Sequence, residues 1–410
     1  MTNIILNSLK KLAFKKAFKI SLVNFMSVFL ILIPFGAVLN YKSTGQFFQS
    51  NKNLRNWRCL TTNIDPIFGS DKNNKCIEDN NLIGLSKEFP PYSKKDNTLD
   101  ILLVGGSGAF DLTAKFDFEK ELNNLIPQNK KLYQKYKYVR VFNASTFGSK
   151  QPSGLFSYQA LEMLGYDFDA LIDFSGFNEI ALSLVENYKL KINPIYPRQA
   201  AQHFVGGARR ITQNRLSFFV EKLLWMHPMH QYLSNKNFYV FLKIFFLDKH
   251  NRMIASKRLG MNYHLPKSEE EAFDQTMRIW GKSVENIYTL TKKNNIPYLL
   301  VIQPNQYLSD SKMFSSKEKS SYIVKSENEL SYYKFFGLKS FAQEIGLVID
   351  KYYGTFTKES FNIPNQNILD LRYVFKNIQE TMYRDKCCHL NKKGMEIISR
   401  AIAKKIIFSF

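Results

Sequence analysis

The sequence predicts an α/β protein in which a parallel sheet lies between two layers of helices. Short apolar runs recur along the chain, and segments with helical periodicity separate them. We expect five parallel strands, at residues 100–104, 138–143, 170–174, 298–303 and 347–349. The length of 410 residues and the 45% of hydrophobic residues allow one large domain with a substantial buried core.

Three helices are expected between or after these strands. Residues 155–164 have helical spacing and connect the second and third strands. Residues 271–293 are predicted to form the crossover helix before the fourth strand. An amphipathic helix is expected after Gly394, close to the C-terminus.

A membrane anchor is predicted at the N-terminus, where residues 20–41 are mostly apolar. This stretch is long enough to cross a bilayer, which requires about 20 such residues. Residues 1–19 contain a lysine cluster and are expected to form a cytoplasmic tail, which places the rest of the chain on the periplasmic or extracellular side. A cleaved signal peptide or a buried core helix is the alternative interpretation of the apolar stretch.

Residues 42–97 are expected to form a linker and a loop region in which a disulfide is permitted. Cys59 and Cys76 bracket a loop rich in Gly, Asp and Asn, whereas Cys387 and Cys388 are adjacent. The predicted compartment favours a Cys59–Cys76 bridge. Four cysteines allow three pairings, however, and the sequence leaves them open.

Residues 98–410 are expected to form the main domain, with a mainly helical insertion at about residues 185–265 that is rich in aromatic and basic side chains. Its apolar faces are expected to pack on the main domain, and contact with a membrane surface or a substrate is the alternative. The formal net charge is +22. The sequence has no zinc-finger spacing, no RNP-like aromatic motif and no compact Lys/Arg tract, so no nucleic-acid partner is expected.

The first predicted strand ends in Gly105-Gly106-Ser107-Gly108, at the sheet edge where open parallel sheets bind ligands. Such glycines suit an exposed nucleophilic serine or a phosphate cradle. A dinucleotide site would need a third glycine where the chain has Asp111, and no Gly-Lys-Ser/Thr follows as in a P-loop. A nucleophilic serine and a purely structural turn remain.

Three further segments contain residues that form a recognisable set together with Ser107. The second strand runs into Asn143-Ala-Ser-Thr-Phe-Gly148, and the third into Gly176-Phe-Asn178-Glu179. Near the C-terminus the chain has Asp385-Lys-Cys-Cys-His389. In this order, the strand-end Ser, Gly and Asn and the C-terminal His resemble blocks I, II, III and V of the SGNH (GDSL-like) hydrolases. The resemblance covers about residues 98–185 and 295–405.

The resemblance implies the SGNH hydrolase fold, a flavodoxin-like three-layer α/β/α arrangement, and a role for each matched residue. Ser107 matches the nucleophile, and His389 matches the base that takes its proton. The main-chain N–H of Ser107, the N–H of Gly148 and the side-chain amide of Asn178 match the three donors of an oxyanion hole.

The chain departs from the family pattern at two places. Gly-Gly-Ser replaces Gly-Asp-Ser, and Asp111 stands where the family usually has a glycine four residues after the nucleophile. The third member of the triad usually lies three residues before the histidine, but Lys386 occupies that position. Asp385 is therefore expected to complete the triad, with Asp370 as the alternative carboxylate and a Ser–His dyad as the remaining possibility.

The expected function is ester hydrolysis through an acyl-serine intermediate, acting on O-acyl groups, such as O-acetyl groups, of a cell-envelope carbohydrate. An O-acyltransferase or a lipid esterase would use the same residues, and a non-catalytic envelope binding protein is the alternative from another class. No cofactor is expected. No metal is expected either, because no carboxylate stands at ligand spacing from His227 and His230. The sequence does not specify protein partners.

Overall fold

The computed structural model describes residues 63–65, 69–71, 92–146, 148–196, 257, 260–322 and 341–409. All of them belong to one compact unit, formed by residues 59–208 and 251–410. The predicted tail and signal-anchor, Cys59 and Cys76, and most of the 42–97 region and of the insertion lie outside the described residues. None of the described helices is both long and apolar enough to cross a membrane.

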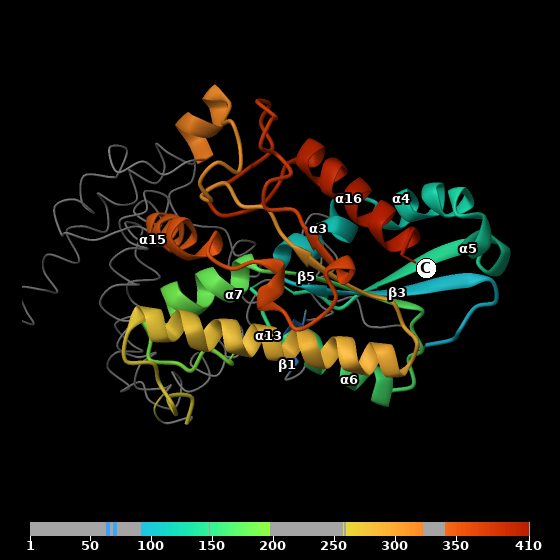
Figure 1. The fold of residues 1–410 in the computed structure, drawn as a ribbon, viewed down its shortest axis with the longest axis horizontal. Helices are drawn as coiled ribbons and strands as arrows, with labels where there is room; N and C mark the ends of the chain where they lie inside the picture. The colour runs from blue at the N-terminus through green and yellow to red at the C-terminus, as the bar shows by residue number, and fades with distance from the viewer. Residues whose placement is uncertain are drawn as a thin grey trace, which may run out of the picture. The chain divides into compact units, whose positions relative to one another are not determined.

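A sheet of five parallel strands forms the centre of the protein (Figure 1). The strands are β3 (Thr98–Gly105), β4 (Tyr138–Asn143), β5 (Ala170–Ser175), β6 (Tyr298–Ile302) and β7 (Ile368–Asp370). Their order across the sheet is β4-β3-β5-β6-β7, which is the flavodoxin-like order 2-1-3-4-5. The predicted α/β class and parallel sheet are confirmed. A separate two-stranded antiparallel sheet consists of β1 (Asn63–Asp65) and β2 (Gly69–Asp71).

The first four predicted strands are confirmed, but the fifth is wrong. Residues 347–349 lie in a helix, because α15 (Phe341–Val348) continues into a π-helical segment, η7 (Ile349–Tyr353). The buried apolar side chains of this segment recur at helical spacing: Ile345, Val348, Ile349, Tyr352 and Tyr353. The apolar run therefore belongs to one face of a helix, and β7 supplies the fifth strand.

Helices cover both faces of the sheet (Figure 1). One layer contains α6 (Ser153–Met163), α7 (Phe177–Leu182) and α13 (Glu269–Lys293); the other contains α3 (Ser107–Ala114), α4 (Phe118–Leu125), α5 (Lys130–Lys135) and α16 (Lys392–Ile407). Alternate side chains of β3 point to opposite layers, so Leu102 and Val104 join one core and Ile101 and Leu103 the other.

The three predicted helices are confirmed as α6, α13 and α16. Two of them begin at a polar cap: the Ser268 side chain accepts the N–H of Glu271, and the Asn391 side chain accepts the N–H of Gly394. Short 3-10 or π segments complete the described chain: η2 (Ile126–Gln128), η3 (Ser183–Tyr188), η5 (Glu318–Tyr322), η8 (Lys358–Ser360) and η9 (Asn365–Asn367).

The strand register brings the carboxyl ends of the strands to one edge of the sheet. Gly105 of β3 pairs with Phe174 of β5, and Ile302 of β6 pairs with Asp370 of β7. The loops that follow β3, β4 and β5 therefore start close together. These loops contain the serine, glycine and asparagine of the sequence motifs.

Candidate active site

The predicted site residues come together at this edge of the sheet. Ser107 is the first residue of α3, Gly148 lies in the loop after β4, and Asn178 lies in the first turn of α7. Asp385 and His389 come from the loop before α16. All five line one cavity of about 600 Å³. The structure thus assembles every residue that the motifs singled out.

Two hydrogen bonds join the serine, the histidine and an aspartate. The Oγ atom of Ser107 lies 2.8 Å from Nε2 of His389, and Nδ1 of His389 lies 2.5 Å from Oδ2 of Asp385. With the ring proton on Nδ1, the imidazole donates to Asp385 and accepts the hydroxyl proton of Ser107 at Nε2. The arrangement can therefore deprotonate the serine as it attacks a substrate.

The turn around Asp385 explains how an acid four residues before the histidine reaches it. The backbone N–H groups of Cys387, Cys388 and His389 all donate to Oδ1 of Asp385, at 2.9, 3.1 and 3.3 Å. The chain thus wraps around one carboxylate oxygen and leaves the other facing the imidazole. Asp370, the alternative acid, is instead held by Arg372, with 2.7 Å between its Oδ2 and Nη2.

The environment of Asp385 keeps it ionised. Burial by itself would raise its pKa, but the hydrogen bond and charge interaction with His389 and the N–H groups of Cys387 and Cys388 outweigh that effect. Together they lower the pKa of Asp385 to about 2. At neutral pH the carboxylate can therefore stabilise an imidazolium on His389.

Two glycines shape the side of the cavity where Asn178 lies. Gly148 has a φ of 69°, a left-handed conformation that disfavours other residues. A Cβ at Gly106 would overlap Nδ2 of Asn178, so the residue before the nucleophile must be a glycine for the amide to approach. Nδ2 of Asn178 donates one hydrogen to the carbonyl oxygen of Ser149 at 2.7 Å. An amide has two N–H donors, so the second remains for a substrate oxygen.

Asn178→Ala is expected to lower kcat about 10²-fold with little change in KM, because the lost donor acts on charge that develops in the transition state. Steady-state kinetics with an aryl acetate would measure both constants. Asn362→Ala is the matched control, since that amide hydrogen-bonds Glu285 on an exposed surface. A rise in KM at unchanged kcat would show that Asn178 only binds substrate.

Glu179 is a buried residue that the sequence motif contained without a role. Its Oε2 accepts the N–H of Gly176 at 2.6 Å, and its Oε1 accepts the N–H of Gln151 at 2.9 Å. One carboxylate thus ties the turn before Asn178 to the loop that carries Gly148. Glu179 therefore links the two segments that contain Gly148 and Asn178, the predicted oxyanion donors.

A second buried acid, Asp173, also hydrogen-bonds Gln151. Oδ2 of Asp173 accepts hydrogen bonds from Nε2 of Gln151 at 2.8 Å and from the hydroxyl of Tyr298 at 3.1 Å. Burial, followed by the negative charge of Glu179, raises the pKa of Asp173 to about 7. Burial also lowers the pKa of Lys150, in the same loop as Gln151, to about 8. Neither Asp173 nor Lys150 belongs to a recognisable motif, so the sequence analysis missed both.

The raised pKa of Asp173 predicts a specific pH dependence of stability. Below about pH 4 this carboxyl is protonated in both the folded and the unfolded protein. Between about pH 4 and pH 7 the unfolded state loses the proton while the folded state keeps it. The contribution of Asp173 to the free energy of unfolding therefore falls across this window, by an amount on the order of a few kcal/mol.

Asp173→Asn is expected to abolish this contribution, so the variant should gain stability over the wild type as the pH rises from 4.5 to 8. Urea unfolding of both proteins at the two pH values measures the difference. Asp350→Asn is the control, because Asp350 is exposed and bonds only Ser309 among the described residues. Parallel pH profiles for Asp173→Asn and wild type would contradict the assignment.

One group of side chains in the described residues has metal-ligand character. The ligand atoms of Cys387, Cys388 and His389 lie within 4.8 Å of one another. Both ring nitrogens of His389 already bond Ser107 and Asp385. Burial raises the pKa of the Cys388 thiol well above its usual value, which disfavours the thiolate that metals bind. The geometry therefore fits a proton relay better than a metal site.

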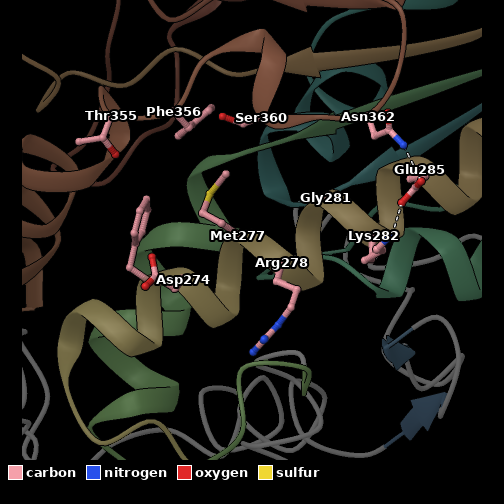
Figure 2. Close-up of a pocket in the computed structure, with 11 residues that line it drawn as sticks. Asp274, Met277, Arg278, Gly281, Lys282, Glu285, Thr355, Phe356, Ser360 and Asn362 are labelled. Atoms are coloured by element: carbon pink, nitrogen blue, oxygen red, sulfur yellow. Dashed lines mark hydrogen bonds and ion pairs between the residues drawn. The ribbon is translucent and has the colours of Figure 1, made fainter.

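A second cavity, of about 450 Å³, lies between α13 and residues 355–362 (Figure 2). Its charged side chains are partly neutralised: Glu285 bonds Lys282 at 2.6 Å and Asn362 at 2.7 Å, as the dashed lines in Figure 2 show. Arg278 extends away from the side chains on the opposite wall. None of the described residues that line it is a histidine or a cysteine, so it lacks the Ser–His pair of the first cavity.

Comparison with known proteins adds no family assignment. No protein-family model matches the chain, and no curated protein matches it. The candidate site is therefore defined by its own geometry.

Proposed function

We propose that the protein is a serine ester hydrolase of the SGNH type that works through an acyl-serine intermediate. The observation that carries the proposal is the pair of hydrogen bonds from Ser107 to His389 and from His389 to Asp385, in a cavity that also contains Gly148 and Asn178. Nucleophile, base, orienting acid and oxyanion donors are the parts that acyl transfer requires.

Each part has a defined step. The Oγ atom of Ser107 attacks the ester carbonyl while Nε2 of His389 takes the hydroxyl proton. The N–H groups of Ser107 and Gly148 and the amide of Asn178 stabilise the oxyanion, and His389 returns the proton to the departing alcohol as the C–O bond breaks. Water, activated in the same way, then hydrolyses the acyl-serine and restores the free enzyme.

The proposed fold family, membrane anchor and substrate class rest mainly on the sequence. The chain order of the Ser, Gly, Asn and His blocks supports the SGNH fold within the flavodoxin-like architecture, with a helical insertion at about residues 185–265. The apolar residues 20–41 and the lysines before them support a single-pass anchor and a catalytic domain in the periplasm or outside the cell. That location favours O-acyl groups of a cell-envelope carbohydrate as substrates.

A fluorophosphonate probe tests the proposal, because it reacts covalently with an activated serine. The probe should label the wild-type protein on the peptide that contains Ser107, and Ser107→Ala should not react. Mass spectrometry of the digested protein locates the label. Folded wild-type protein that stays unlabelled would favour the non-catalytic binding protein.

The proposed topology has its own test. A reporter fused after Phe410 is expected to lie on the non-cytoplasmic side, because the lysine cluster precedes the apolar stretch at residues 20–41. A phosphatase fusion that is active only outside the cytoplasm, paired with a fluorescent fusion that is active only inside, measures the location. Activity of the cytoplasmic reporter alone would overturn the proposed compartment and make a Cys59–Cys76 bridge improbable.

A further inference from the structure

Two basic side chains line the cavity that contains Ser107. Lys115 follows the last residue of α3, and Arg384 directly precedes Asp385. Both line the cavity, and their side chains are 37% and 34% exposed. The two cations are therefore accessible beside the proposed nucleophile.

One buried carboxylate holds both of them. Oδ1 of Asp111 lies 2.7 Å from Nζ of Lys115, and Oδ2 lies 2.7 Å from Nη2 of Arg384. The Asp111 side chain is only 1% exposed and lines a separate, smaller void rather than the main cavity. A ligand in the main cavity therefore meets the two cations and not the carboxylate that positions them. This arrangement gives a role to the aspartate that replaces the expected glycine.

Lys115 and Arg384 together can still bind an anion. Lys115 and Arg384 share the single negative charge of Asp111, which leaves one positive charge in excess. Asp385, the one carboxylate among the described residues that line this cavity, is occupied by His389 and three backbone N–H groups. A guanidinium has five N–H donors, and Asp111 is the one carboxylate that contacts Arg384 among the described residues. Several donors therefore remain for a ligand.

We infer that Arg384 and Lys115 form a subsite for an oxyanion group of the substrate, so that the ester is carried by a negatively charged glycan. The inference rests on the proposed esterase function and deepens it by naming the substrate class. A carboxylate, as in a uronic acid, or a phosphate would match the planar fork of Arg384 and the ammonium of Lys115. A neutral glycan offers only uncharged oxygens, which form weaker hydrogen bonds with these cations than an ionised group does.

The same contacts have a structural interpretation, because Arg384 adjoins Asp385 and its bond to Asp111 also anchors the loop of the triad. The two interpretations predict different kinetics. A loop anchor would affect every ester equally. An oxyanion subsite would affect only esters that carry the charged group.

The test compares three acetylated oligosaccharides: a uronate, a sugar phosphate and a neutral glucan. The full chain is assayed in detergent as wild type, Arg384→Gln, Lys115→Gln and the control Lys282→Gln, which removes an exposed lysine paired with Glu285. We expect the wild type to prefer an anionic ester about 10-fold in kcat/KM. In both subsite variants the ratio of kcat/KM for the anionic ester to kcat/KM for the neutral ester should fall to about one, whereas Lys282→Gln should keep the wild-type ratio. The uronate and phosphate arms show which oxyanion is recognised.

Equal kcat/KM for all three esters in the wild type would overturn the inference, and so would an equal loss on neutral and anionic esters in Arg384→Gln. Calorimetric titration of Ser107→Ala with the same oligosaccharides tests for the anion subsite without requiring turnover. Tighter binding of an anionic oligosaccharide that Arg384→Gln abolishes would support the subsite, whereas equal binding of all three would refute it. Absence of turnover for every ester, with the anion preference in binding retained, would refute the esterase function alone.

Discussion

Replacing Ser107 or His389 by alanine is expected to abolish ester turnover, with a fall in kcat of about 10⁶-fold for either variant. In the proposed mechanism the two side chains act as one unit, because the proton of the serine passes along the 2.8 Å hydrogen bond between them. Removing either leaves only the oxyanion donors and substrate binding, so the double variant should be no worse than either single one. Hydrolysis of an aryl acetate, measured with stringently purified protein, gives the three values.

Matched controls separate this effect from damage to the fold. Ser309→Ala and His264→Ala remove the same side chains from exposed positions and should keep full activity. Thermal unfolding of Ser107→Ala and His389→Ala should resemble that of the wild type, because both residues lie on loops or helix ends at the sheet edge rather than in the apolar core. Ser107→Ala that still turns over the ester at the wild-type rate would exclude the proposed mechanism.

Much of the fold could be predicted because local patterns determine it. The strands at residues 138–143 and 298–302 are apolar runs, and the long helix α13 shows its period over many turns. The fifth strand could not be predicted in this way. Three apolar residues, 347–349, fit a strand as well as a helix, and only the longer pattern of buried residues from Ile345 to Tyr353 distinguishes the two.

Some residues of the candidate site could likewise be predicted from local sequence patterns, whereas others depend on contacts between residues far apart in the sequence. Ser107, Gly148 and Asn178 each follow a predicted strand, so their positions at the sheet edge follow from the topology of the fold. The role of Glu179 depends on a hydrogen bond to Gln151, 28 residues away. The pairing of Asp111 with Arg384 spans 273 residues. No single-sequence pattern reports such contacts, because each needs the packing of several elements.

The choice between Asp385, Asp370 and a dyad was left open by the sequence for a related reason. The number of residues between two positions in a loop does not determine the distance between their side chains, because a tight turn can accommodate an additional residue. Here three backbone N–H groups close the turn on Oδ1 of Asp385 and direct Oδ2 to the imidazole. Asp370 is instead engaged with Arg372 at the end of β7.

Asp385→Asn is therefore expected to lower kcat by about 10⁴-fold while the protein stays folded. An asparagine can keep an oxygen where Oδ1 accepts the three N–H groups, so the turn should survive. It places an NH₂ group against Nδ1 of His389, however, and this group cannot accept the Nδ1 proton. The imidazole then favours the wrong tautomer, with its proton on the nitrogen that must receive the one from Ser107.

Kinetics of four variants distinguish the carboxylate triad from the dyad. Asp385→Asn and Asp385→Ala should both be strongly impaired, and Asp350→Asn, the same change at an exposed site, should match the wild type. Asp370→Ala leaves the buried guanidinium of Arg372 without its carboxylate, so it should lose stability more than intrinsic kcat. If Asp385→Ala and Asp370→Ala both retained a kcat within about threefold of wild type, against the loss of about 10⁴-fold that a triad requires, Ser107 and His389 would act as a dyad. The 2.5 Å contact between His389 and Asp385 would then stabilise the loop without contributing to catalysis.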